Sequence, residues 1–173
     1  MKMKHNTKGF TVLELTIVAV VIAVISALAI PQFAKVMERL KLKTAGRDVI
    51  SSMRLARSSA VSQRDQFGVY FDYTEGQYVL FHDLANPSSF TYNPGSDTII
   101  VTNVLPGRVN IGYVSFPSSA VIFRPNGSAA SSGQVLLYSY SEGEQYLGSL
   151  TVDVLGSTGR VKLLLDDYYF GED

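Results

Sequence analysis

A continuous apolar run near the start of the chain limits its possible folds more than any other feature. Within Leu15–Ile30 only Thr16 and Ser26 carry polar side chains. The wider stretch Phe10–Ala34 has 25 residues, which extend over ~37 Å as an α-helix at ~1.5 Å per residue. Because ~30 Å is enough to cross the hydrocarbon of a bilayer, we expect residues 10–34 to form a membrane-spanning helix.

One carboxylate, that of Glu14, lies almost at the head of this run. A charged acid deep in a membrane costs on the order of 2.5–3.5 kcal/mol, so it is a functional candidate by default. A purely structural explanation fits equally well, because Thr11 and Glu14 have the spacing of a helix capping box. The spacing alone leaves both explanations open.

The residues that flank the run bear on cleavage and orientation. Ser26-Ala27-Leu28-Ala29 fits a signal-peptidase site, which would make the run a secretory signal that is removed. Against this, a basic leader, residues 1–9, ends in Gly directly before Phe10, upstream of the apolar residues. The positive-inside rule does not favour a cytoplasmic N-terminus, since three lysines precede the run and four basic residues follow it closely: Lys2, Lys4 and Lys8, then Lys35, Arg39, Lys41 and Lys43.

The stretch KGFTVLEL, which begins at Lys8, resembles the class III signal of type IV prepilins and type II secretion pseudopilins. The resemblance implies that a prepilin peptidase cuts between Gly9 and Phe10, that Phe10 is N-methylated, and that the apolar helix is retained. Glu14 would then pair with the new terminal amine of Phe10, in its own or a neighbouring subunit, and set register during filament assembly. Pro31 falls where the long helix of that family is commonly kinked.

The same resemblance implies a location and partners. The chain would span the bacterial inner membrane once, with a cytoplasmic N-terminus before processing and a periplasmic head. Its partners would be the prepilin peptidase, inner-membrane lipid, and other major and minor pilins or pseudopilins. The cytoplasmic N-terminus that the resemblance implies disagrees with the count of basic residues on the two sides of the apolar run. We follow the resemblance on this point.

Charge divides the rest of the chain into a basic helix and an acidic head. Eight basic and two acidic residues lie within 35–64, whereas four basic and twelve acidic residues lie within 65–173. Apolar residues at three- and four-residue spacing predict an amphipathic stalk helix over 35–64; they are Leu42, Ala45, Val49, Met53, Ala56 and Ala60. Seven of its basic residues fall within about a third of the helix circumference; they are Lys35, Arg39, Lys43, Arg47, Arg54, Arg57 and Arg64. That face is either solvated or meets acidic heads or anionic lipid around a filament.

Short alternating segments separated by turn residues predict strands after Gln66. The expected strands are Phe67–Tyr73, Gln77–His82, Thr98–Asn103, Arg108–Tyr113, Ala120–Arg124, Gln134–Tyr140, Gly148–Leu155 and Gly159–Leu165. The polar stretch Asn86–Ser96 is expected to be a mobile loop. One long helix followed by many strands predicts an α+β fold, with an antiparallel β-sheet head at 65–165 packed on the helix and an acidic, aromatic tail at 166–173.

The head has a resemblance of its own, to GspH/FimT-like pseudopilins. It is carried by MRLARSSAV from Met53, by VIFRPNGSAASSGQVLL from Val121 and by GSTGRVKL from Gly156. The first motif is usually written Ala-Arg-Ser-Glu-Ala, and Ser59 replaces its Glu here. The resemblance implies a type IV pilin-like fold and a structural role.

Enzyme classes find little support in the residue inventory. The chain has no Cys, and only His5 and His82, so thiolate or His-based metal sites and most catalytic triads are excluded. None of the common phosphate-binding or zinc-protease motifs is present. The pairs Asp166/Asp167 and Glu142/Glu144 are interpreted as solvated acidic surface. We therefore expect no catalysis, no metal and no cofactor.

The favoured hypothesis is a GspH-like minor pseudopilin at or near the tip of a type II secretion pseudopilus. The alternative is a FimT-like minor type IV pilin in pilus assembly or DNA uptake, a family associated with DNA contacts near the closing Gly-Arg strand. Arg160 and Lys162 are the matching basic residues. The acidic head opposes phosphate binding, so nucleic acid is not the expected partner. The tail residues Tyr168, Tyr169 and Phe170 either dock a partner or are simply buried against the head or disordered, and we favour the second interpretation.

Overall fold

The computed structural model describes residues 10–165, so the predicted leader and the predicted tail lie outside the described residues. One long helix is followed by eight strands and a short 3-10 helix in this range. Their bounds are α1 Val12–Gln63, β1 Phe67–Asp72, β2 Gln77–His82, β3 Thr98–Val104, β4 Val109–Val114, η1 Pro117–Ser119, β5 Ala120–Phe123, β6 Gly133–Tyr140, β7 Tyr146–Leu155 and β8 Arg160–Leu165. Both ends of each predicted strand lie within two residues of the ends of an observed strand.

The chain forms two compact units, which divide within α1 between Val36 and Met37. In the first unit, the Thr11 Oγ1 atom accepts the backbone N–H of Glu14 at 3.2 Å, which is one half of the predicted capping box. The apolar side chains that follow are exposed, and Pro31 lies inside the helix. This part of α1 is long and apolar enough to cross a membrane, by length and composition.

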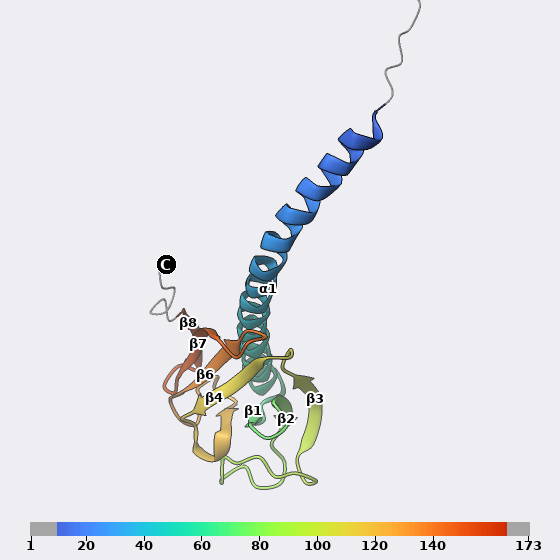
Figure 1. The fold of residues 1–173 in the computed structure, drawn as a ribbon. Helices are drawn as coiled ribbons and strands as arrows, with labels where there is room; N and C mark the ends of the chain where they lie inside the picture. The colour runs from blue at the N-terminus through green and yellow to red at the C-terminus, as the bar shows by residue number, and fades with distance from the viewer. Residues whose placement is uncertain (1–9, 166–173) are drawn as a thin grey trace, which may run out of the picture. The chain divides into compact units, whose positions relative to one another are not determined.

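The strands of the second unit form two four-stranded antiparallel sheets, where the sequence predicted one head without dividing it. The first sheet has the order β3-β2-β1-β5 and the second the order β4-β6-β7-β8. The strands of both sheets gather around the later part of α1 (Figure 1). The long pairings β6–β7 and β7–β8 join strands that follow each other in the chain, so local turns set most of the second sheet.

The inner faces of both sheets share one hydrophobic core with α1. The predicted helix stripe is confirmed, because all six of its members are buried: Leu42, Ala45, Val49, Met53, Ala56 and Ala60. Gly46 lies on the same helix, and a Cβ placed there would come within 2.7 Å of the Leu150 Cδ1 atom on β7. The missing side chain at Gly46 therefore permits a close approach between α1 and the second sheet.

Part of the outer face of the first sheet is covered as well. Val79, Phe81 and Ile122 form a second core cluster, against which Phe90 and Tyr92 pack. The sequence predicted a polar, mobile loop at Asn86–Ser96, and the structure adds that two aromatic side chains within it pack on a sheet face. Burial on both faces explains why β1, β2 and β5 are almost continuously apolar rather than alternating.

A charged network joins the start of the second unit to its loops. Glu38 is 6% exposed, and its Oε1 atom accepts from Lys41 at 2.9 Å and lies 3.5 Å from the Arg108 guanidinium. Arg108 also pairs with Glu142 at 3.0 Å. This buried carboxylate is one of only two acids in the basic helix segment, and its cationic partners offset the cost of its burial.

Replacing Met53 by Ala should lower the free energy of unfolding of the second unit by about 2–5 kcal/mol, because it opens a cavity at a fully buried position of the helix stripe. Leu55→Ala is the matched control, since Leu55 is 51% exposed on the same helix. Chemical denaturation of the full chain in detergent, followed by near-UV circular dichroism, measures both variants. Equal losses for the two variants would contradict the packing described here.

Candidate functional site

The residues predicted to drive assembly lie at the exposed start of α1. Phe10 is 79% exposed, and the Glu14 side chain is exposed too. Within residues 10–165 the Glu14 carboxylate has no hydrogen bond or ion pair, so the reciprocal half of the capping box is not formed. Gly9, the other side of the predicted cleavage bond, lies outside the described residues. The Glu14 carboxylate is thus available to a partner that carries a positive charge.

A second site arises where the three quoted motifs of the head meet. Arg57, from MRLARSSAV, donates its Nε–H to the carbonyl oxygen of Gly127 at 2.8 Å. Gly127 belongs to the turn in the second motif, and Gly159 of the third motif packs directly on it. Gly159 has a φ of +62°, and a Cβ there would collide with the Gly127 carbonyl oxygen and lie 3.0 Å from Arg57 Nε. Only glycine suits this position, because it needs both a left-handed backbone and no side chain.

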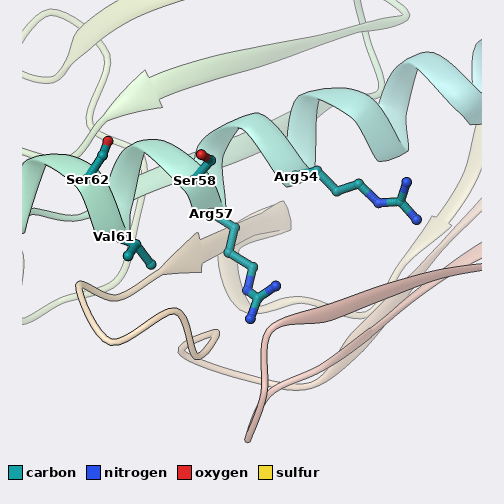
Figure 2. Close-up of a pocket in the computed structure, with 5 residues that line it drawn as sticks. All are labelled: Arg54, Arg57, Ser58, Val61 and Ser62. Atoms are coloured by element: carbon teal, nitrogen blue, oxygen red, sulfur yellow. The ribbon is translucent and has the colours of Figure 1, made fainter.

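Beside this junction the surface is hollowed along α1. One pocket of about 410 Å³ is lined by helix residues only, and Arg54, Arg57 and Val61 leave the helix on the same side (Figure 2). A neighbouring pocket of about 320 Å³ shares Arg54 and reaches Leu163 on β8. We call the two pockets together the arginine groove; it is lined by Arg47, Ile50, Ser51, Arg54, Arg57, Ser58, Val61, Ser62 and Leu163.

The structure does not bring Arg160 and Lys162 into this groove. Val161 points into the core, with 7% exposure, and successive residues of a strand point to opposite faces of the sheet. Arg160 and Lys162 therefore lie on the outer face of the second sheet, where Lys162 is opposite Asp153 of β7. The basic residues singled out in the sequence thus lie on separate surfaces.

The most perturbed titratable groups surround the end of β2. His82 pairs with Asp65 at 2.8 Å, and this hydrogen bond lowers the pKa of the Asp65 carboxyl. Asp97 accepts backbone N–H groups from Leu84 and Ala85, both at 3.0 Å, and so anchors the loop that follows β2. Asp83 is fully buried, and burial, followed by repulsion from Asp97 and Asp65, raises its pKa to about 6.

The three carboxyl groups of Asp65, Asp83 and Asp97 hold the end of β2 and the loop that follows it in place. Within residues 10–165, no group of three His, Asp or Glu side chains is placed to hold a metal ion. The amide nitrogen of Gln66 can donate to the Asp83 Oδ2 atom at 3.2 Å, which supplies one partner for the buried carboxyl.

Of the pairs interpreted as acidic surface, Glu142 is 82% exposed at its side chain and binds Arg108, and Asp166/Asp167 lies outside the described residues.

Three solved structures share this fold with the chain. The minor pseudopilin EpsH from the type 2 secretion system of Vibrio cholerae is 12% identical, with a TM-score of 0.57, over 73% of this chain and 98% of that chain. The type IV minor pilin FimU of Pseudomonas aeruginosa is 16% identical, with a TM-score of 0.55, over 73% and 90%. Escherichia coli GspH is 13% identical, with a TM-score of 0.52, over 76% and 93%. The fold, one long N-terminal helix packed on antiparallel sheets, is pilin-like.

The sequence comparison narrows this class to one family. The family model of the type II transport protein GspH matches residues 45–156, which is more than half of the chain. The chain therefore belongs to the GspH family, whose members are structural pseudopilin subunits. No curated protein matches the chain in sequence.

Sequence reasoning placed Arg54 and Arg57 on a basic helix face but did not identify the groove. The sequence did hold a clue to the groove, in the three motifs of the head. Each motif supplies one residue of the junction beside the groove: Arg57, Gly127 and Gly159. Their meeting depends on the turns after β5 and β7, which lie 70 residues or more from Arg57 in the sequence. Spacing along the chain carries no information at that separation.

Asp83→Asn should stabilise the fold at neutral pH by an amount on the order of 1–3 kcal/mol. The native state holds the Asp83 proton up to a pKa of about 6, against 3.8 for an ordinary Asp. The folded wild type therefore binds more protons than the unfolded chain, and its stability falls as pH rises from about 4 to about 6. The gain in the variant should grow over that window and stay constant above it.

Urea denaturation of both proteins from pH 4 to pH 8 measures this difference. Glu75→Gln, at an exposed carboxyl in the turn between β1 and β2, is the control for a lost negative charge. A gain for Asp83→Asn that is independent of pH would show that the buried carboxyl does not titrate as stated.

Proposed function

We propose that the chain is a minor pseudopilin of a type II protein secretion system, a structural subunit at or near the tip of the periplasmic pseudopilus. Membership of the GspH family over residues 45–156 is the observation that carries this proposal. The exposed apolar segment of α1 supports it, because a filament core or a membrane would cover side chains that the described fold leaves open. No chemical step is assigned to the subunit.

Processing starts the working cycle in this proposal. Prepilin peptidase cuts between Gly9 and Phe10, Phe10 is N-methylated, and the helix at residues 10–34 remains as the anchor. Before cutting, the N-terminus faces the cytoplasm and the head the periplasm, with the anchor in the inner membrane. Pro31 bends the helix, because proline lacks the N–H that would bond the preceding turn and its ring crowds the carbonyl of Ala27.

Assembly then depends on charge pairing at the new N-terminus. In the apolar core of a filament, the Glu14 carboxylate pairs with the Phe10 amine of its own or a neighbouring subunit. Removing one partner of a buried pair leaves an uncompensated charge and is costly, so correct register is strongly favoured over displaced packing. Other pseudopilins are the partners of this step.

A minor type IV pilin is the second candidate function, because FimU shares the fold at a TM-score of 0.55. The family match favours secretion. Deleting the gene and measuring type II secretion and twitching motility in the same strain separates the two: loss of secretion alone supports the proposal, and loss of motility alone supports the alternative.

Intact mass in cells with and without the prepilin peptidase tests the processing step. We expect the loss of residues 1–9 and the gain of one methyl group only where the peptidase is present. Retention of residues 1–9 would identify a plain membrane-anchored domain. Cleavage near Ala27–Ala29 would identify a secreted one, and either result would overturn the proposal.

Glu14→Gln separates pairing from capping. Gln serves a capping box as well as Glu does, whereas it cannot neutralise the Phe10 amine. We therefore expect Glu14→Gln to lower incorporation into filaments at least about tenfold, the effect of ~1.4 kcal/mol, with the protein still present in the membrane. The fraction of the chain in sheared filaments measures this.

Thr11→Ala is the matched control. It removes the hydrogen bond that Thr11 Oγ1 accepts, at a cost of about 1 kcal/mol in helix stability, and should leave incorporation near wild type. If Thr11→Ala fails to assemble and Glu14→Gln succeeds, Glu14 acts as a capping residue and not through its charge.

A further inference from the structure

From the geometry of the arginine groove we infer that it binds a carboxylate-bearing segment of a neighbouring filament subunit. This inference rests on the proposed function, since it assumes that the head has protein neighbours in a filament. It adds a docking surface on the head to the assembly residues at the start of α1.

The guanidinium group of Arg57 is already oriented for such a ligand. Its Nε–H is occupied by the Gly127 carbonyl oxygen at 2.8 Å, which fixes the plane of the guanidinium. The two terminal nitrogens remain, and a guanidinium fork of this kind matches a carboxylate through two parallel hydrogen bonds. Because Gly127 already holds the side chain, less rotamer entropy is lost on binding.

Arg54 supplies a second charge without an internal partner. Its side chain is exposed, and among residues 10–165 it forms no hydrogen bond or ion pair. It lines both pockets of the groove. Ser58 adds a hydroxyl donor and Val61 an apolar wall to the first pocket, and Leu163 adds an apolar wall to the second.

Charge outside the groove favours a protein ligand over nucleic acid. Residues 65–165 carry eight acidic and four basic side chains, and Arg160 and Lys162 lie on the outer face of the second sheet. A duplex needs a continuous basic surface that neutralises many phosphates, whereas the groove offers only the guanidinium groups of Arg47, Arg54 and Arg57. One acidic segment fits that arrangement, and heads as acidic as this one could provide it.

The first experiment titrates the full chain in neutral detergent with a short fluorescent oligo-glutamate peptide as the probe. Arg54→Gln, alone and together with Arg57→Gln, should weaken binding about tenfold, as expected when charge-assisted hydrogen bonds are lost. Arg64→Gln removes the same charge just past the end of α1, outside the groove, and should leave binding unchanged. Arg54→Gln alone keeps the test decisive if loss of the Arg57–Gly127 bond unfolds the head.

Three results would overturn the inference. One is equal weakening by Arg64→Gln, which shows nonspecific attraction of the peptide to positive charge. Another is tighter, Arg54-dependent binding of a duplex DNA of matched charge, which identifies a nucleic-acid site. The third is tighter peptide binding by a chain that ends at Leu165, which shows that residues 166–173 are the occupant.

The same variants in cells separate this inference from the proposed function. Arg54→Glu with Arg57→Glu should reduce secretion severalfold, with cleavage at Gly9 and methylation of Phe10 unchanged. Wild-type secretion by this variant would refute the docking role alone. Failure of cleavage in the wild type would refute the proposed function, and the peptide titration is independent of cleavage.

Discussion

One helix face has to supply the core for two sheets, and the rest of the head depends on this constraint. Val49, Met53, Ala56 and Ala60 have no exposed surface, and they share a single core with residues from both sheets. Small side chains suit this role because they let strands approach from two directions, as Gly46 does for Leu150. The face of the same helix next to this stripe is exposed, and the basic residues gather there at the edge of the head.

The packing also positions the arginine groove. α1 forms its floor, and Leu163 of β8 closes it on one side. The turns at Gly127 and Gly159 meet over Arg57 because β5 and β8 lie at the ends of the two sheets, and residue Ala129 bonds Gly156 across the gap between them. A surface feature thus arises from the way in which two sheets share one helix.

Much of this fold could be predicted from the sequence. The helix stripe and the strands were local patterns, and each pattern reflected burial on a face of a regular element. The division into two sheets could not be predicted, because β1 and β5 pair across nearly fifty intervening residues and no local period records such a pairing. The packing of Phe90 and Tyr92 was missed for a related reason: the loop is polar on average, and no local period shows that its two aromatic side chains pack on the outer face of the first sheet.

The sequence by itself determined the parts that depend on short stretches of chain: the apolar helix, the carboxylate at its head, the basic stalk and the strand positions. These parts follow from the periodicity of apolar residues and from the cost of placing charge in an apolar environment. Both can be read from a few neighbouring residues. Only the tertiary structure decided which basic residues share a surface. Arg54 and Arg57 line one groove, because distant turns of the chain meet beside them. Arg160 lies on another face, because successive residues of a strand point to opposite sides of the sheet.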